Sequence, residues 1–291
     1  MANLKDIRSR IGSVKNTQQI TRAMKMVSAA KLRRAQNNIV NLRPYAKELL
    51  KVIADISITQ RVSHPLLNPV ADPKNVLLVV ITSDRGLCGG FNANINRFAM
   101  NYYKENQSKY ETMDLLCVGR KAGEFFKKRG VTPKKTILNL AREISYDLAA
   151  DVANDLMEHF TEGHYDSIYL IYNEFKSAIS QEVVCERLLP IEVKEAHLND
   201  EILASPDLIF EPAPEKIIED LLVKHFSIQV YRCLSESVAA EHGARMAAME
   251  NATKNAGEMI SNLTLTYNKM RQAAITTELI EITSGAEALN G

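Results

Sequence analysis

The start of the chain repeats apolar side chains at alternating intervals of three and four positions. The three-and-four spacing is kept from Leu4 to Ile56, and such a repeat is typical of a coiled-coil helix. At 1.5 Å per residue, residues 3–57 would form a helix roughly 80 Å long. Pro44 lacks an N–H donor, so we expect it to kink or divide this helix.

A polar interval interrupts this N-terminal repeat. The repeat positions here hold Gln18, Thr21, Lys25 and Ser28, whereas the apolar Met24, Met26 and Val27 lie beside them. A polar interval in a coiled coil can fix the register of the partner helix or contact another subunit. The sequence leaves both possibilities open.

The same repeat returns at the end of the chain, from Ala239 to Ala274. Pro214 suits the first turn of a helix, and a glycine such as Gly285 suits its end. We therefore expect one helix over residues 214–285, roughly 105 Å long. Gly285 is the expected stop. His242 lies within the repeat and is expected to pack there, because no cluster of cysteines and carboxylates accompanies it. The two ends of the chain are thus predicted to be coiled-coil helices.

Between these helices, short apolar segments alternate with amphipathic ones. Such alternation predicts an α/β domain with a mostly parallel sheet. Strands are expected at 76–82, 113–118, 167–175 and 177–190, and helices at 92–106, 120–129 and 146–162. A proline-rich linker at 64–73 and a second boundary at 207–214 flank this domain. We therefore divide the chain into an N-terminal coiled-coil helix (1–58), a globular α/β domain (59–212) and a long C-terminal coiled-coil helix (213–291).

Charge is unevenly distributed, although the chain as a whole holds 36 basic and 35 acidic residues. Residues 1–43 contain ten basic side chains and one acidic one, a net charge of +9, whereas residues 211–291 contain seven and eleven, a net charge of −4. Opposite charges favour the two ends lying side by side, and the surplus positive charge predicts an acidic partner, either protein or nucleic acid. One alternative is therefore a nucleic-acid-associated coiled-coil protein that uses its basic N-terminal helix. Residues 1–43 hold no aromatic side chain for stacking on bases, which weighs against it.

The most conspicuous candidate for chemistry is the loop DRGLCGGFN at 84–92, between an expected strand and an expected helix. Phosphate-binding loops occur at this place, but this one lacks the lysine and hydroxyl of a Walker loop, and its glycines do not match G-x-G-x-x-G. A mononucleotide site built from backbone N–H groups and a tight structural turn both remain open. The chain also lacks the common hydrolase, zinc-protease and calcium-loop motifs. We expect no catalytic site, no cofactor and no metal.

Cysteine usage and hydropathy indicate the compartment. Cys88, Cys117, Cys185 and Cys233 show no zinc-finger spacing and are expected to be buried free thiols. No apolar run approaches the roughly 18 residues of a membrane span, and the charged start is unlike a secretory signal. We expect a soluble, cytosolic chain.

Three segments resemble the γ subunits of F-type ATP synthases of the bacterial type: RSRIGSVKNTQQITRAMKMVSAAKLRRAQ at 8–36, DRGLCGGFN at 84–92 and ITTELIEITSGAEA at 275–288. The resemblance covers the whole chain in order. It implies a long antiparallel coiled coil of the N- and C-terminal helices with a central Rossmann-like α/β domain. The implied function is that of the central rotor shaft of a proton-translocating F1Fo ATP synthase. Such a shaft couples rotation driven by proton flow to conformational change at the catalytic β subunits, and works in reverse on ATP hydrolysis.

The resemblance also implies partners and site residues. The partners would be the α3β3 head, the ε subunit and the ring of c subunits, with one copy of the chain per complex and no nucleic acid. The chain would be a non-catalytic, peripheral subunit at the cytoplasmic face of the bacterial inner membrane. Residues expected to contact other subunits and transmit torque are Arg271, Gln272, Thr276, Glu278, Met24, Lys25, Arg33 and Arg34; those of an apolar bearing tip are Leu279, Ile280, Ile282 and Leu289.

Overall fold

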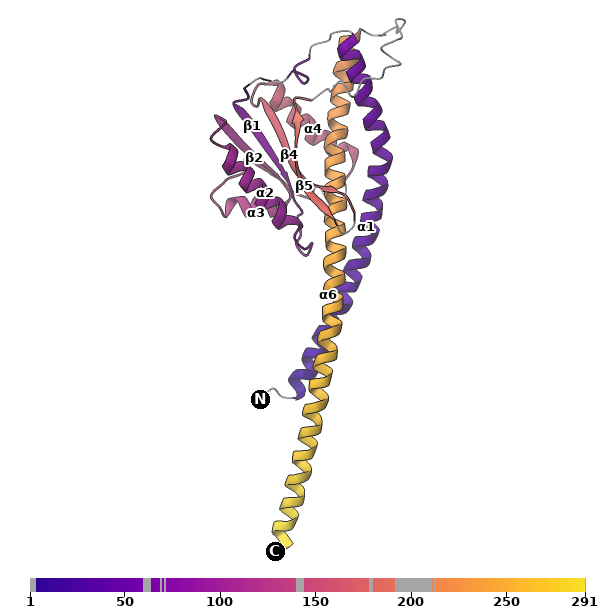
Figure 1. Cartoon of the computed structure of the whole chain (residues 1–291), viewed down its shortest axis with the longest axis vertical. Helices are drawn as coiled ribbons and strands as arrows, with labels where there is room; N and C mark the ends of the chain where they lie inside the picture. Colours follow the sequence, from indigo (N-terminus) through magenta and orange to yellow (C-terminus); the bar gives the residue numbers. More distant parts are fainter. Residues whose placement is uncertain are drawn as a thin grey trace. The chain divides into compact units, whose positions relative to one another are not determined.

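The computed structural model describes residues 4–59, 64–68, 70, 72–139, 144–177, 180–191, 211 and 213–290. The chain divides into two compact units, one formed by Met1–Ser28 with Met246–Gly291 and the other by Ala29–Arg245. Two long helices, α1 (Leu4–Thr59) and α6 (Pro214–Asn290), contribute to both units (Figure 1). The two long terminal helices are therefore confirmed, whereas the three-part division at 58 and 212 stays a prediction.

Helix α1 continues through Pro44. The expectation that this proline could divide the helix is wrong. Proline removes one backbone hydrogen bond, but side chains on either side of it belong to the same core: Leu42 packs against that core, and Ala46 and Leu49 are buried in it. This packing holds both sides of the proline in one helix.

Helix α6 continues beyond its expected end at Gly285, to Asn290. A glycine inside a helix costs about 1 kcal/mol relative to alanine. The residues that follow it, Ala-Glu-Ala-Leu, are strong helix formers. Gly285 is therefore tolerated inside the helix, and its use as a stop signal was wrong.

The unit Ala29–Arg245 contains a five-stranded sheet with the order β3-β2-β1-β4-β5. All neighbouring strands are parallel except β4 and β5, which are antiparallel. This confirms the mostly parallel α/β sheet, although the three-residue β3 was missed because it is too short to show a period. The elements are β1 (Asn75–Ile81), α2 (Phe91–Asn106), β2 (Thr112–Val118), α3 (Arg120–Lys127), β3 (Lys135–Ile137), α4 (Tyr146–Thr161), β4 (Ser167–Phe175) and β5 (Gln181–Leu189).

Both faces of this sheet are covered, because successive side chains of a strand point to opposite faces. In β1, Leu77 and Val79 belong to a core shared with α4 and with parts of α1 and α6, whereas Leu78 and Val80 belong to a second core shared with α2 and α3. Figure 1 shows the α6 segment of this unit between α1 and the edge strand β5. Strands buried on both faces explain the uninterrupted apolar run of β1.

A bidentate ion pair ties α6 to the edge of the sheet. The Arg232 guanidinium donates to the two carboxylate oxygens of Glu186 on β5 at 2.7 and 2.8 Å. The Tyr172 hydroxyl on β4 joins the cluster at 3.0 Å from Glu186. Two parallel charge-assisted bonds fix direction as well as distance, so this cluster orients α6 on the sheet.

Three of the four free cysteines are buried, and Cys185 is half-buried. Burial raises the pKa of the Cys117 thiol to about 12. No helix in the part of the chain that the structure describes has both the length and the apolar character of a membrane span.

Candidate functional site

The two terminal helices pair in the unit formed by Met1–Ser28 and Met246–Gly291. Lys25 Nζ donates to Glu250 Oε1 at 2.6 Å, and the Thr21 and Thr253 hydroxyl oxygens lie 2.8 Å apart. Farther along, Gln18 packs over Gly257. Because moving toward the start of α1 means moving toward the end of α6, the pair is antiparallel, as expected.

The polar interval of α1 contacts α6. Gln18 Nε2 donates to the Thr253 carbonyl at 3.4 Å, and Thr21 and Ser28 are buried. Polar groups that meet across an otherwise apolar seam favour one alignment of the two helices over others. Of the two roles left open by the sequence, these contacts favour the one that fixes the register.

An apolar strip lies beside this seam. Ile20, Met24 and Val27 occur at spacings of four and three and so share one face of α1. Ile20 and Val27 are each 59% exposed, whereas Met24 is half-buried. Met24 and Val27 were already noted beside the polar interval in the sequence, whereas Ile20 was missed, although its position four residues before Met24 was the signal that could have found it. Exposed apolar side chains in a contiguous strip are a mark of interaction surfaces.

The other expected contact residues of α1 lie in a different unit. Arg33 and Arg34 are exposed side chains of the unit Ala29–Arg245, whereas Met24 and Lys25 belong to the helix pair described above.

The last turns of α6 extend past the start of α1. Continuing the antiparallel register places Leu4, where α1 begins, opposite about Met270, which is half-buried. Residues 275–286 are all exposed. The expected contact residues Arg271, Gln272, Thr276 and Glu278 are exposed as well, and the Thr276 hydroxyl donates to the carbonyl of Gln272 within the helix at 2.9 Å.

This end of α6 presents large apolar side chains to solvent. Leu279 and Ile280 are 58% exposed and Ile282 is 67% exposed. Ile275, which is not among the residues of the expected tip, is 49% exposed. The Leu289 side chain, the remaining residue of the expected tip, lies outside the described residues. Leucine and isoleucine gain free energy on leaving water, so an apolar environment supplied by another chain would stabilise this end.

The glycine-rich loop at 84–92 is bonded into its own unit. The Asp84 carboxylate accepts hydrogen bonds from the backbone N–H groups of Arg120 and Asn139 at 2.9 and 3.0 Å. Arg245 on α6 donates to the carbonyl of Gly86 at 3.2 Å. A phosphate-binding loop offers N–H groups to an anion, whereas this loop offers a carbonyl to a cation. These contacts favour the structural turn over the mononucleotide site.

Arg245 also organises a buried cluster on α6. It donates to Glu241 at 2.6 Å, and its Nη1 lies 3.4 Å from His242 Nδ1. Burial, together with the positive charges of Arg245 and Lys31, lowers the pKa of His242 to about 4. Burial raises the pKa of the Glu241 carboxyl, which Arg245 only partly offsets. His242 is thus buried on the seam, as expected.

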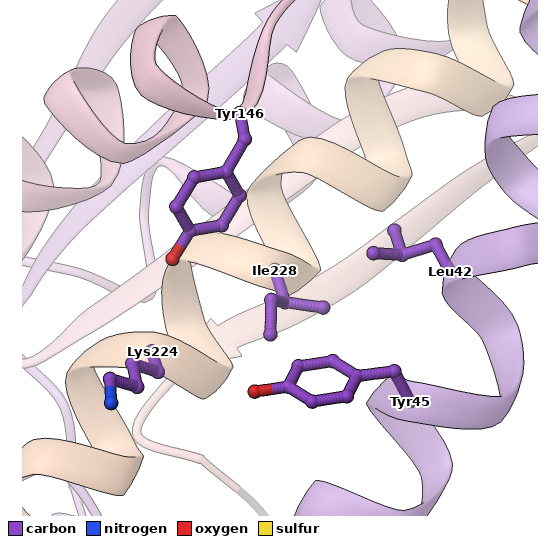
Figure 2. A pocket seen from close by; sticks show the side chains of 5 residues that line it. All are labelled: Leu42, Tyr45, Tyr146, Lys224 and Ile228. Atoms are coloured by element: carbon purple, nitrogen blue, oxygen red, sulfur yellow. The ribbon is translucent and has the colours of Figure 1, made fainter.

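A cavity of about 270 Å³ opens among α1, α4 and α6 in the unit Ala29–Arg245 (Figure 2). Tyr45 and Tyr146 bring phenol rings to it from α1 and α4, and Lys224 and Ile228 come from α6. Both tyrosines are exposed, so the cavity is open to solvent. None of the expected site residues lines it.

Comparison with known proteins identifies the family. A family model described as ATP synthase matches residues 3–289. The ATP synthase gamma chain of Bdellovibrio bacteriovorus is 62% identical, and the match covers all of both chains. The chain belongs to the ATP synthase gamma chain family. The gamma chain of Geobacter sp. (strain M21) is 50% identical, again over all of both chains.

Solved structures agree with this family assignment. A chain from the central stalk and c-ring of the Tetrahymena thermophila mitochondrial ATP synthase is 30% identical, with a TM-score of 0.60, and the match covers 80% of this chain and 99% of that one. A chain of the Euglena gracilis mitochondrial enzyme shares the fold, with a TM-score of 0.67 at 24% identity over 98% of this chain and 94% of that one. The resemblance drawn from the sequence motifs is confirmed, and the nucleic-acid alternative finds no support.

Proposed function

We propose that the chain is the central rotor shaft of a proton-translocating F1Fo ATP synthase. It couples rotation driven by proton flow to conformational change at the catalytic β subunits, and ATP hydrolysis drives the reverse rotation. The observation that carries this proposal is full-length membership of the gamma chain family, at 62% identity to a bacterial gamma chain.

The helix pair supports this role through its asymmetry. The strip of Ile20, Met24 and Val27 lies on one face of α1 only. Three identical subunits arranged around the shaft would therefore each contact a different surface of it. A shaft that binds one subunit conformation better than another shifts that subunit toward the preferred state. By linkage, nucleotide binding at that subunit acts on the orientation of the shaft with the same coupling free energy.

The partners in this proposal are the α3β3 head, the ε subunit and the c-subunit ring, with one copy of the chain per complex. The chain acts without a catalytic site of its own, as a peripheral subunit at the cytoplasmic face of the bacterial inner membrane. Exposed cations of α1, such as Arg33 and Arg34, meet acidic surfaces of the head.

The exposed end of α6 divides into two roles. Arg271, Gln272, Thr276 and Glu278 present polar groups that hydrogen-bond the head and carry torque. Leu279, Ile280, Ile282 and Leu289 form an apolar tip that turns within an apolar collar. Apolar contact is non-directional, so such a tip can rotate without breaking directed bonds.

Reconstitution tests this function. Purified chain is mixed with α and β subunits, and the expected product is an α3β3γ particle that contains one copy per three β subunits and hydrolyses ATP continuously. A bead attached through Ser108→Cys, at an exposed position, reports rotation; the natural thiols are less suitable because three are buried and Cys185 is half-buried. A stable particle that hydrolyses ATP without turning the bead would contradict the rotor role.

A further inference from the structure

The C-terminal end of α4 brings together three side chains that bind metals in other proteins. Among the described residues, His159, Glu162 and His164 form a group whose ligand atoms all lie within 4.8 Å of one another. His159 Nδ1 and His164 Nδ1 are 3.3 Å apart, and His164 Nδ1 is 3.3 Å from Glu162 Oε2.

The backbone explains why these residues meet. The N–H of His164 donates to the carbonyl of His159 at 3.1 Å, and the N–H of Gly163 donates to the carbonyl of Phe160 at 3.1 Å. Gly163 has a φ of 74°. These are the two bonds and the left-handed residue of a Schellman motif, which commonly brings apolar side chains near the two ends of the turn into contact. Here His159 and His164 make that contact instead, with Glu162 as the last residue before the glycine.

The two separations from His164 Nδ1, 3.3 Å to His159 Nδ1 and 3.3 Å to Glu162 Oε2, match those of ligand atoms around zinc. Zinc bound tetrahedrally at 2.0–2.1 Å from nitrogen keeps neighbouring ligand atoms roughly 3.3 Å apart. Two imidazoles and one carboxylate are the ligand set of open zinc sites, in which water completes the coordination. Oxygen-preferring cations such as Mg²⁺ take carboxylates and waters rather than imidazole. We propose that His159, Glu162 and His164 form a surface site for Zn²⁺.

The surroundings suit such a site. The side chains of Glu162 and His164 are 51% and 56% exposed, so a hydrated ion can reach them. The His159 ring stands edge-on to Tyr165, with centroids 6.3 Å apart at 88°. The Tyr165 hydroxyl is held in turn by Asp114 at 2.7 Å. Such packing orients a ligand ring before the ion arrives, which lowers the ordering cost of binding.

The site joins the last turn of α4 to the segment that leads into β4. Zinc bound there holds the native arrangement and stabilises it, because an ion that binds the folded chain better than the unfolded one raises the unfolding temperature. No metal was expected from the sequence, and this site was missed there. The sequence pattern that marks this site is H-x-x-E-G-H across a helix end, which differs from the zinc-finger and protease spacings.

Calorimetric titration of the tag-free, full-length chain with ZnCl₂ tests the proposal. We expect the wild type to bind Zn²⁺. His159→Gln and His164→Gln should each weaken that binding at least about tenfold. Loss of a residue that only supports a ligand already lowers metal affinity by that factor, and loss of the ligand itself should lower it no less. Glu158→Gln, a change at an exposed neighbour outside the cluster, should bind as the wild type does. MgCl₂ should give no binding to this site.

Thermal unfolding supplies a second measurement. Zinc should raise the unfolding temperature of the wild type and of Glu158→Gln but not of the double variant His159→Gln/His164→Gln, and EDTA should reverse the rise. If a variant fails to fold, the visible absorption of Co²⁺ bound to the wild type reports tetrahedral nitrogen and oxygen ligands directly. The proposal is overturned if the wild type binds no zinc, if the folded double variant binds it as tightly as the wild type, or if bound Co²⁺ gives an octahedral spectrum.

Discussion

The hydroxyl oxygens of Thr21 on α1 and Thr253 on α6 lie 2.8 Å apart in the seam of the helix pair. Each also lies within hydrogen-bond distance of a carbonyl in its own helix, Gln18 at 3.0 Å and Met249 at 2.7 Å. A threonine hydroxyl carries one hydrogen, so two hydrogens are shared among three contacts. The pair therefore contributes alignment of the helices more than it contributes stability.

Substituting both threonines by valine tests this interpretation. Each single change, Thr21→Val or Thr253→Val, should lower the free energy of unfolding by about 0.5–1.5 kcal/mol, because it breaks a hydrogen bond. The double variant should be no less stable than either single one, since replacing both partners removes the polar contact altogether. Urea unfolding of the four chains measures the cycle.

The control for this cycle is Thr17→Val. Thr17 is exposed and donates to the carbonyl of Ser13 in its own helix, so its substitution should change stability little. If the double variant instead loses a free energy of unfolding equal to the sum of the two single losses, the two hydroxyls act independently.

Charge reversal can test the separate roles of the cations of α1. Lys25 is already paired with Glu250, and both side chains are more than one-third exposed, so the pair contributes little stability. Reversal at Arg33 and Arg34 should weaken assembly with the α and β subunits, and more so at low than at high salt, because exposed charges are screened. The measurement is the yield of assembled particle across a salt series.

Lys25→Glu needs its own control, because it places a second carboxylate beside Glu250. Adding Glu250→Lys restores opposite charges across the helices while it leaves the reversal at position 25. If Lys25 acts on the head, the double reversal should still assemble poorly at low salt. An assembly defect that does not vary with salt would indicate a packing role for these positions.

The exposed end of α6 allows a test of torque transmission. Gln272→Leu combined with Glu278→Ala should lower coupled ATP synthesis while the isolated chain keeps its helical content, because both side chains are exposed and leucine and alanine are good helix formers. Synthesis in inverted vesicles and circular dichroism measure the two effects. Normal synthesis would remove these residues from the transmission role.

A matched pair elsewhere on the same helix controls for the chemistry of these changes. Asn262→Leu with Glu258→Ala removes one amide and one carboxylate at exposed positions opposite α1 rather than beyond its start. This variant should synthesise ATP as the wild type does. Equal losses in both variants would show a general effect on α6 rather than a contact at its end.

The parts of the fold that the sequence predicted well are those with a regular period. Every repeat position from Leu4 to Ile56 is buried or half-buried, and the repeat from Ala239 to Ala274 behaves in the same way. The antiparallel sense came from the family resemblance, because a heptad repeat is symmetric with respect to direction. The end of the helix at Gly285 failed because a local preference of about 1 kcal/mol cannot stop a helix whose neighbours favour it.

The site features that escaped sequence reasoning depend on contacts between distant residues or on turn geometry. The hydrogen bond from Arg245 to the Gly86 carbonyl joins residues 159 positions apart, and no local sequence pattern predicts it. The meeting of His159 with His164 depends on the left-handed Gly163, since a straight helix would place residues five positions apart on different sides. The exposure of Leu279 follows from where α1 begins, a property of the pair rather than of α6.

His242 should make the stability of the chain depend on pH. Its pKa is about 4 in the folded chain, against 6.5 for an unperturbed histidine. Between these pH values the unfolded chain binds a proton that the folded chain does not, so the free energy of unfolding rises with pH across this window. Acidification from pH 6.5 to 4 should therefore cost up to about 3 kcal/mol from this group, with no further loss below pH 4.

Replacing the imidazole of His242 measures how much of the pH dependence of stability comes from this group. The charged groups that act on this part of α6 include Arg245, Lys31, Glu241 and Asp84. Glu241 has a raised pKa, so its contribution to stability falls as the pH rises, which is the opposite slope. His242→Gln keeps Glu241 and removes the imidazole, and urea unfolding at pH 4 to 7 should show a smaller loss on acidification than in the wild type. An unchanged loss would assign the acid sensitivity to other groups and would mean that His242 accepts its proton in the folded chain.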